Sequence, residues 1–241
     1  SYIMGSMVKE STLNRWVQQQ LKVWESSRKK AEETPDEPRP FITISREYGC
    51  NAIKIAETLT EELNKIENLD NWHFYDKDII NKIVEEHKIS ETIIETVDTR
   101  RREEMNELFR SMLTDLPPQV AVYKKLAKTI RSLSIHGRSI IVGRAGVVIT
   151  RGLRFGIHLR LVAPYNYRVQ EIMQLKDIRD KQEAEKLVDQ KDRERHDFLT
   201  QYIKFDAGNP SSYDLTINVA RLSVDEIAEI VISALRSKKF I

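Results

Sequence analysis

The sequence predicts an α/β fold of three layers, in which helices cover both faces of a parallel five-stranded sheet. The chain has 241 residues, 40% of them hydrophobic, which is enough for one large domain with a sizeable core. Short apolar segments alternate with helical patterns, as is typical of right-handed β-α-β crossovers. The segments expected to form strands are residues 41–45, 72–75, 139–142, 157–162 and 214–219.

The charge balance argues against nucleic acid or a membrane as a partner. There are 39 Lys and Arg residues against 37 Asp and Glu, so the formal charge of +2 creates no strong overall field. No apolar run approaches the roughly 20 residues that span a bilayer. The single cysteine, Cys50, excludes an internal disulfide and suits a reducing compartment. We therefore expect a cytoplasmic protein.

The histidines form no pattern that is typical of a metal site. They are not part of an H-E-x-x-H motif and have no cysteine partners, so we expect no protein-held metal. Their positions are His73, His87, His136, His158 and His196. A G-x-S-x-G motif is also missing, which argues against a hydrolase of that kind.

Residues 1–40 are predicted to form an N-terminal extension. An amphipathic helix is expected from residue 12 to about residue 33, because apolar residues recur at helical spacing. This apolar stripe contains Leu13, Trp16, Val17, Leu21 and Trp24. The proline-rich segment 32–40 cannot continue the helix and is expected to be a linker. The stripe can pack on its own domain or form a homodimer or protein-partner contact, and the sequence leaves both open.

Residues 78–136 are too long for a simple crossover between the second and third strands. Their pattern is helical and is interrupted at Pro117-Pro118, so we expect a helical insertion. The last predicted helix begins with Ser223 followed three residues later by Glu226, which is the spacing of a capping box.

The loop after the first strand lies where a phosphate would bind. It runs from Ser45 to Lys54 and leads from a strand into a helix N-terminus, where free N–H groups and the helix dipole favour anions. The G-x-x-x-x-G-K-[ST] pattern is absent, because the loop has one glycine, Gly49. Lys54 stands where a magnesium-binding hydroxyl is expected.

Four segments together resemble the cytidylate kinase-like family of P-loop nucleoside monophosphate kinases. The first segment is I-T-I-S-R-E-Y-G at 42–49, and the second is F-Y-D-K at 74–77. The third consists of V-G-R at 142–144, V-A-P at 162–164 and Y-R-V at 167–169. The fourth consists of D-R-E-R at 192–195, Y-D-L at 213–215, I-N at 217–218 and R-L-S at 221–223. The resemblance implies a P-loop kinase fold over residues 41–241. It also implies an acceptor-side insertion at 78–136 and a lid at 170–212.

The resemblance implies that ATP binds over the loop and that a nucleoside monophosphate binds beneath the insertion. Arginines suit this chemistry because one guanidinium can bind two phosphate oxygens. The implied catalytic residues are Arg144, Arg193 and Arg195. The implied ATP-binding residues are Arg46, Gly49, Cys50, Asn51, Ala52, Ile53, Lys54 and Arg168. The implied acceptor-binding residues are Asp76, Lys82 and Asp192.

Each of these residues also has a structural interpretation. Arg193 and Arg195 lie in a charged run that is typical of a solvated helix face, and Arg144 can form a structural ion pair. Asn51 and Ala52 replace the family's usual glycine pair, and Ala145 stands where true cytidylate kinases have an aspartate for the cytosine ring. The sequence therefore predicts Mg²⁺-dependent phosphoryl transfer from ATP to a nucleoside monophosphate, with CMP as the first guess. The alternative is a catalytically degenerate nucleotide-binding or regulatory protein on the same fold.

Overall fold

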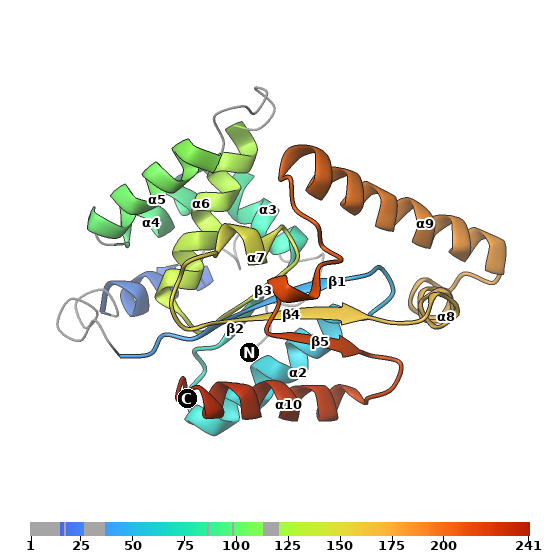
Figure 1. The fold of residues 1–241 in the computed structure, drawn as a ribbon. Helices are drawn as coiled ribbons and strands as arrows, with labels where there is room; N and C mark the ends of the chain where they lie inside the picture. Colours follow the sequence, from blue (N-terminus) through green and yellow to red (C-terminus); the bar gives the residue numbers. More distant parts are fainter. Residues whose placement is uncertain (1–14, 17, 27–36, 86, 98, 113–120) are drawn as a thin grey trace.

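The fold is a single parallel sheet with helices on both faces, as the sequence predicts. The computed structural model describes residues 15–16, 18–26, 37–85, 87–97, 99–112 and 121–241. The strand order is β2-β3-β1-β4-β5, and every neighbouring pair is parallel (Figure 1). The strands are β1 (Phe41–Arg46), β2 (His73–Tyr75), β3 (Ser139–Val142), β4 (Gly156–Val162) and β5 (Leu215–Asn218). Each strand agrees with its predicted range to within one residue at either end.

The order of the strands puts β1 in the centre of the sheet, between β3 and β4. Ile44 pairs with Val142 on one side and with Leu159 on the other. Ser45 pairs with Arg160, so β1 and β4 continue together to the carboxyl edge. In open α/β sheets, ligands bind outside the carboxyl ends of the strands where neighbouring connections leave in opposite directions. The segment after β1 lies at this position.

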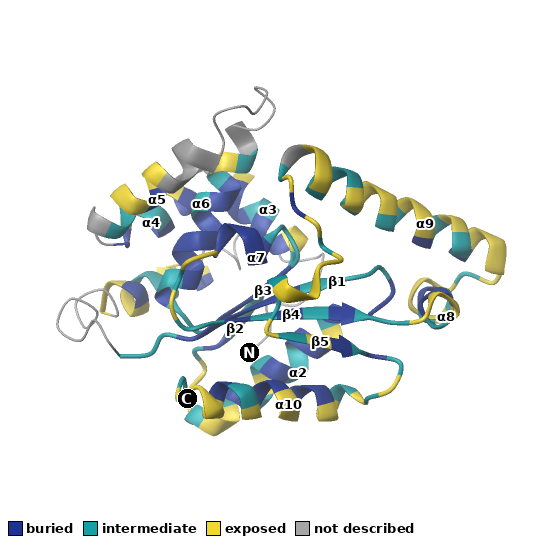
Figure 2. Cartoon of the chain, viewed as in Figure 1, coloured by how far each residue is buried: buried dark blue, intermediate teal, exposed yellow. Residues whose placement is uncertain are grey.

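Helices α2 (Ala52–Glu67) and α10 (Val224–Ser237) cover one face of the sheet (Figure 1). Their apolar sides, including Leu59, Leu63 and Val231, pack with Ile42 and Leu159 of the central strands. These side chains are buried, whereas the outer sides of both helices are exposed (Figure 2). The predicted capping box at the start of α10 is present, which satisfies two backbone N–H groups there.

The predicted helical insertion contains several helices that cover the opposite face of the sheet (Figure 1). They are α3 (Lys77–Glu85), α4 (His87–Glu95), α5 (Thr99–Met112) and α6 (Ala121–His136). Their buried residues Ile80, Ile83, Ile93 and Ile130 form a second core together with Ile141 of β3. The break predicted at Pro117-Pro118 lies outside the described residues.

The N-terminal extension packs on its own domain through both tryptophans. Described residues between 15 and 26 are helical. The indole of Trp16 meets His73 and Tyr75 edge-on, at ring-centroid distances of 5.4 and 5.9 Å. The indole of Trp24 stacks on His136 at 5.4 Å. The stripe thus covers the β2 edge and α6, while a dimer contact through this helix stays a prediction.

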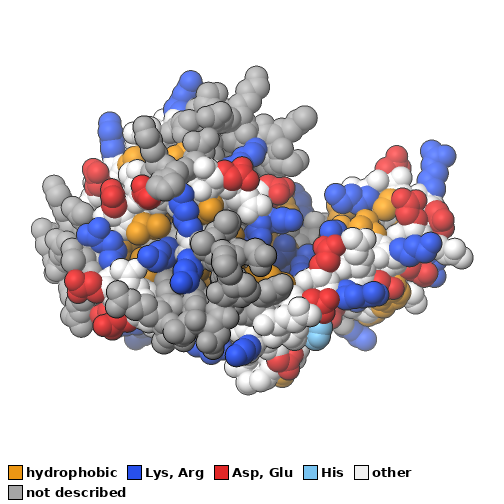
Figure 3. Space-filling model, turned by 90° about the horizontal axis from the view of Figure 1, so that it is seen from above, with side chains coloured by type: hydrophobic (Ala, Val, Ile, Leu, Met, Phe, Trp, Pro, Cys, Tyr) orange, Lys and Arg blue, Asp and Glu red, His pale blue; other side chains and the backbone are white. Residues whose placement is uncertain are grey.

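The remaining elements form the side of the molecule that borders the carboxyl edge of β1 and β4. They are α7 (Gly146–Ile149), α8 (Tyr165–Lys176), α9 (Lys181–Asp197), the π-helical turn η3 (Phe198–Tyr202) and the 3-10 turn η4 (Pro210–Ser212). Basic and acidic side chains are interspersed over this side when it is seen from above (Figure 3). Among the described helices, none combines the length and apolar character that crossing a membrane requires.

Candidate functional site

A cleft of about 830 Å³ lies at the carboxyl edge of the central strands. Its floor is formed by the end of β1 and by Arg160 of β4, and its walls by the start of α3, the β3–α7 turn and α9. The segment 205–208, near the end of the predicted lid region, closes another side. The cleft therefore joins the predicted phosphate edge of the sheet to both the insertion and the lid.

Three of the predicted arginines meet in this cleft. Arg46 comes from the end of β1, Arg144 from the β3–α7 turn and Arg195 from α9. Burial, together with the positive charges of Arg195 and Arg144, lowers the pKa of Arg46 to about 9. Burial also lowers the pKa values of Arg144 and Arg195. Like charges that crowd together in a half-buried space favour an anionic ligand among them.

The backbone of the β3–α7 turn is unusual, because Gly143, Arg144 and Ala145 all have positive φ, at 79°, 53° and 55°. The side chain of Arg46 leaves room only for glycine at position 143, because a Cβ there would lie 1.8 Å from Nη1 of Arg46. Arg144 donates to Oδ1 of Asn81, and its buried Nε has no hydrogen-bond partner among the described residues. Left-handed residues other than glycine cluster at functional sites, so the turn supports the assignment of Arg144 to the cleft.

Arg168 and Asp192 bind each other and the loop after β1. Arg168 donates to Asp192 and, at 3.0 Å, to the carbonyl oxygen of Tyr48. Asp192 in turn accepts the N–H of Tyr48 at 2.8 Å. Arg168 also lies 3.4 Å from Glu47, and a Cβ on Gly49 would meet its backbone oxygen at 2.7 Å. These two residues, predicted to bind ATP and acceptor, hold the loop against α8 and α9 in this structure.

The rest of the predicted phosphate loop lies outside the lining of the cleft. Cys50 and Ala52 are buried, and burial raises the pKa of the Cys50 thiol to about 12. Ile53 packs against the core beneath α2. Lys54 is exposed and lies 3.7 Å from Glu57 on the same helix. Asn51 begins α2 in the left-handed conformation, and its side chain does not cap the helix.

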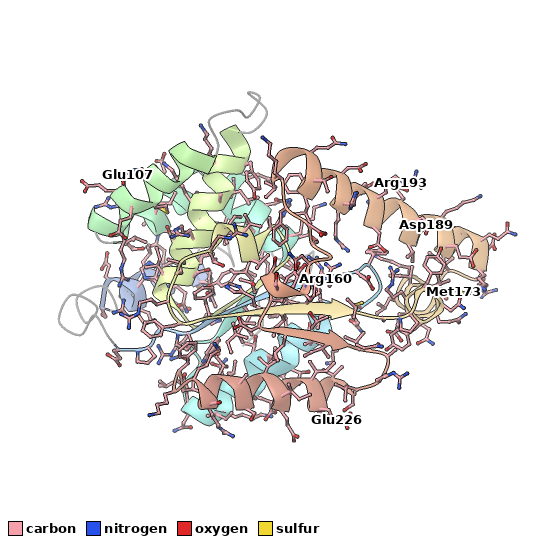
Figure 4. The ribbon with its side chains drawn as sticks, in the orientation of Figure 1. Glu107, Arg160, Met173, Asp189, Arg193 and Glu226 are labelled. Atoms are coloured by element: carbon pink, nitrogen blue, oxygen red, sulfur yellow. The ribbon has the colours of Figure 1, made fainter. Side chains whose placement is uncertain are left out.

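Three other predicted residues also lie beside the cleft rather than in its lining. Asp76 accepts the N–H groups of Asp78 and Ile79 and so begins α3. Its charge nevertheless raises the pKa of Arg46, which opposes the larger effect of burial. Lys82 is a half-buried residue of α3. Arg193 is exposed and borders a separate groove on the outer side of α9, away from Arg160 and the sheet (Figure 4).

Sequence reasoning missed several polar residues of the cleft. Arg160 of β4 lies on the floor, and the other missed cations are Lys77, Lys176 and Lys191. The signal for Arg160 is the alternation of apolar and polar residues in G-I-H-L-R-L-V, which is unusual for an inner strand covered on both faces. The lysines lie on helices, where charged residues are common, so no pattern distinguished them.

The chemistry of the cleft suits nucleotide phosphates. It also suits a Mg²⁺ ion that takes one or two carboxylates from the protein and its other ligands from phosphates and water. Among the described residues, no group of three His, Cys, Asp or Glu is placed to hold a metal ion. Mg²⁺ usually takes one or two carboxylates and completes its shell with substrate phosphates and water. Asp78 and Asp206 line the cleft and have no ion pair among the described residues, so they are the carboxylates that would hold it. Bound Mg²⁺ would supply positive charge to the phosphates.

Comparisons with known proteins agree with this architecture. The fold is similar to that in the crystal structure of an uncharacterized protein from Eubacterium ventriosum, with a TM-score of 0.65 and 19% identity over 83% of this chain and 99% of that one. A curated uronate isomerase from Corynebacterium glutamicum is 24% identical over 105 residues, which are 44% of this chain. The chain spans only 20% of that relative's length. The model of the cytidylate kinase-like family matches residues 41–221. With its sheet order and cleft, the chain belongs to the cytidylate kinase-like family.

Proposed function

We propose that this protein moves the γ-phosphoryl group of ATP to a nucleoside monophosphate, with CMP as the first candidate acceptor. Family membership supports a nucleotide kinase-like function in general. The single observation that carries the proposal is the meeting of Arg46, Arg144 and Arg195 in one cleft at the carboxyl edge of the sheet. Phosphoryl transfer depends mainly on positioning and on positive charge around the phosphoryl oxygens.

The three arginines reach the cleft from parts of the chain that can hold different portions of the ligands. Arg144 is next to Asn81 of α3, on the side of the insertion, and we assign it to the acceptor phosphate. Arg195 comes from α9 on the opposite side. Arg46 is close to both, since the positive charge of each lowers its pKa. This arrangement suits a phosphoryl group that passes from one phosphate to another.

One end of the cleft is apolar and suits a nucleoside. Val147, Phe198, Leu199 and Phe205 line it. Aromatic and aliphatic side chains bind the faces of a base without selecting its polar edge. Ala145 offers no side-chain hydrogen bond at this end, so the proposal sets no preference among the bases.

The alternative is a nucleotide-binding or regulatory protein without turnover. The observation that favours it is the position of the loop: Gly49 is packed against Arg168, and Lys54 lies at the surface beside Glu57. A loop closed in this way offers its N–H groups poorly to a triphosphate. The alternative uses the same arginine cleft for binding, so catalysis is what separates the two.

The deciding experiment combines calorimetric titration with a turnover screen. ATP with Mg²⁺ and CMP are titrated separately, and phosphoryl transfer is measured against all common nucleoside monophosphates. We expect binding of both ligands and turnover with at least one acceptor. Binding without turnover supports the alternative, and absence of any nucleotide binding contradicts both.

Arg144→Ala tests the placement of the acceptor. We expect the variant to bind CMP more weakly while its affinity for ATP changes less, since Arg144 lies on the side of the insertion. Arg236→Gln is the control, because Arg236 is exposed on α10 and does not line the cleft. Equal losses for CMP and ATP in Arg144→Ala would mean that the acceptor has been placed at the wrong end.

A further inference from the structure

The two faces of β4 differ in polarity, although helices cover the sheet on both sides. Ile157, Leu159 and Leu161 are buried in the core beneath α2 and α10. His158 and Arg160 alternate with them and are half-buried on the opposite face. An inner strand of a parallel sheet is normally apolar on both faces, so the two polar side chains need a physical reason.

The structure accounts for His158 by contacts within the protein. Its Nδ1 lies 2.8 Å from Oγ1 of Thr43, and its ring meets Phe41 edge-on at 6.0 Å. Burial lowers the pKa of its imidazole, so the neutral ring is favoured at this position. His158 is therefore a packed residue of the sheet and needs no ligand.

Arg160 differs, because it has no anionic partner in the part of the chain that the structure describes. Its Nη1 donates to Oγ of Ser45 at 3.0 Å, and Ser45 is a neutral partner. Among the described residues, Arg160 forms no ion pair, although it lines the cleft. Its positive charge instead contributes to the lowered pKa of Arg195. A guanidinium has five N–H donors, and the contact with Ser45 uses one of them.

A chain of hydroxyl groups fixes the orientation of this guanidinium. The hydroxyl of Tyr213 lies 3.1 Å from the carbonyl oxygen of Ala207 and 3.3 Å from Oγ of Ser45. The Tyr213 hydroxyl is the donor in both contacts, and Oγ of Ser45 also accepts from Nη1 of Arg160. Ser45 is therefore held between Tyr213 and Arg160, which fixes its position beside the guanidinium.

A neighbouring arginine shows what a guanidinium with anionic partners looks like in this protein. Arg168 is about as buried as a core residue, and it has Asp192 and Glu47 as anionic partners and Tyr48 as a backbone acceptor. Within the described residues, Arg160 has no such anionic or backbone partner, and its one hydrogen bond is to Ser45. A half-buried, positioned guanidinium without a counter-ion is expected to bind an anion that enters from solution.

We propose that Arg160 is a phosphate-binding residue of the cleft, and that Ser45 and Tyr213 position it. The inference rests on the proposed function, since it assumes that the cleft binds the phosphates of a nucleotide. It adds a fourth arginine to Arg46, Arg144 and Arg195, on the floor of the cleft. Arg160 would thus contact the phosphate groups and make no contact with the base.

Arg160→Gln tests the proposal with probes that separate phosphate from nucleoside. CMP and inorganic pyrophosphate are titrated by calorimetry, and cytidine binding is followed by ligand-detected NMR. We expect the affinities for CMP and pyrophosphate to fall about 10- to 100-fold, as for the loss of a charged hydrogen bond. Cytidine binding should not change, and Arg236→Gln, an exposed arginine on α10, should match the unaltered protein in every titration.

Two further changes test the positioning role and guard against a variant that fails to fold. Arg160→Lys keeps the charge but loses the planar donors, so we expect an intermediate loss of CMP affinity. Tyr213→Phe removes the hydroxyl that donates to Ser45, so we expect a loss of about 2- to 10-fold for CMP with cytidine unaffected. A purely structural role of Tyr213 would instead lower the affinities for both ligands together.

The outcomes distinguish this inference from the proposed function. If Arg160→Gln and Arg160→Lys bind CMP and pyrophosphate as the unaltered protein does, the inference is wrong and the proposed function stands. If cytidine binding falls as much as CMP binding, Arg160 only maintains the shape of the cleft and the inference is again wrong. If the unaltered protein binds neither CMP nor pyrophosphate, both are wrong.

Discussion

At the scale of single residues, the arginines of the carboxyl edge fall into two groups. Arg46, Arg144 and Arg160 form no ion pair among the described residues, and all three line the cleft. Arg168 is joined to Asp192 and Glu47 and holds the loop. Arg195 combines both features, because it lines the cleft and also lies 3.7 Å from Asp192.

Arg195→Ala should lower kcat more than Arg193→Ala, although the two residues are neighbours on α9. Arg195 lines the cleft and Arg193 borders the outer groove. Loss of a charge that acts on the transferring phosphoryl group typically costs about 2–4 kcal/mol of transition-state stabilisation. Steady-state kinetics of both variants, with melting temperatures as the folding control, make the comparison. Equal turnover in the two variants would contradict the catalytic assignment of Arg195.

Asn51→Gly and Ala52→Gly should change stability in opposite directions. Asn51 has φ of 47°, a conformation that costs glycine little, so its replacement should raise the free energy of unfolding by about 0.5 kcal/mol. Ala52 is a buried residue of α2, and glycine there should lower that free energy by about 1 kcal/mol. Urea unfolding measures both. A stability loss in Asn51→Gly would show that its side chain has a role that the contacts do not reveal.

The same pair of changes tests the loop as a phosphate site. Glycine at both positions lets a phosphate approach the backbone at the start of α2, so we expect the double variant to bind ATP more tightly. The single variants serve as controls in the same calorimetric titration. Unchanged or weaker ATP binding by a folded double variant would exclude Gly49 to Lys54 as a phosphate loop.

At the scale of elements, α9 and the loop after β1 are tied together. Asp192 of α9 accepts the N–H of Tyr48 and pairs with Arg168 of α8, and Arg195 donates to the carbonyl oxygen of Arg46 at 3.3 Å. The guanidinium of Arg195 lies over the ring of Tyr48, and its Cζ is 5.5 Å from the ring centroid. Movement of α9 away from the sheet would therefore free the loop as well.

Asp192→Asn should loosen this connection. Arg168 would keep Glu47 but lose its closer anionic partner, so we expect a loss of about 1–2 kcal/mol, since the pair is only partly exposed. Hydrogen exchange should become faster in α9 and in residues 47–49. The matched control is Asp189→Asn, because the exposed Asp189 contacts only the hydroxyl of Tyr165 among the described residues. Similar exchange in both variants would show that the connection does not hold α9.

At the scale of the whole molecule, one buried and two half-buried imidazoles join separate layers. His73 and His136 carry Trp16 and Trp24 of the N-terminal helix, and His158 joins β4 to β1. Burial is the main cause of the lowered pKa in each, to about 4 for His73 and about 3 for His136. The neutral forms therefore belong to the folded state.

The stability should fall as the pH is lowered below about 6.5, the pKa of an unfolded histidine. Between pH 6.5 and about 4, the unfolded chain binds protons at His73 and His136 that the folded chain does not bind. In this range each histidine lowers the free energy of unfolding by up to about 1.4 kcal/mol for each pH unit. Below the pKa values of the folded state, the pH no longer changes this contribution. Urea unfolding at several pH values measures it, and His136→Gln should flatten the curve. Constant stability between pH 6.5 and 5 would contradict the burial of these rings.

Much of the fold could be predicted because it depends on local patterns. Apolar runs located all five strands, and the positions of Ser223 and Glu226 located the start of α10. In the site, the resemblance selected Arg46, Arg144 and Arg195, which the structure brings together. It also selected Arg193, which lies on the opposite side of α9, because a motif gives the order of residues but not the direction of each side chain.

The sequence by itself determined the α/β class, the strand ranges and the family resemblance, because hydrophobic periodicity and turn residues act over a few neighbours. Only the tertiary structure decided which cations have counter-ions. Arg168 meets Asp192 across 24 residues, whereas Arg160 meets the neutral Ser45 across 115. Such pairings depend on strand order and on how α8 and α9 cross the edge of the sheet. A single sequence does not record these distances, so the difference between arginines with anionic partners and arginines without them appears only in three dimensions.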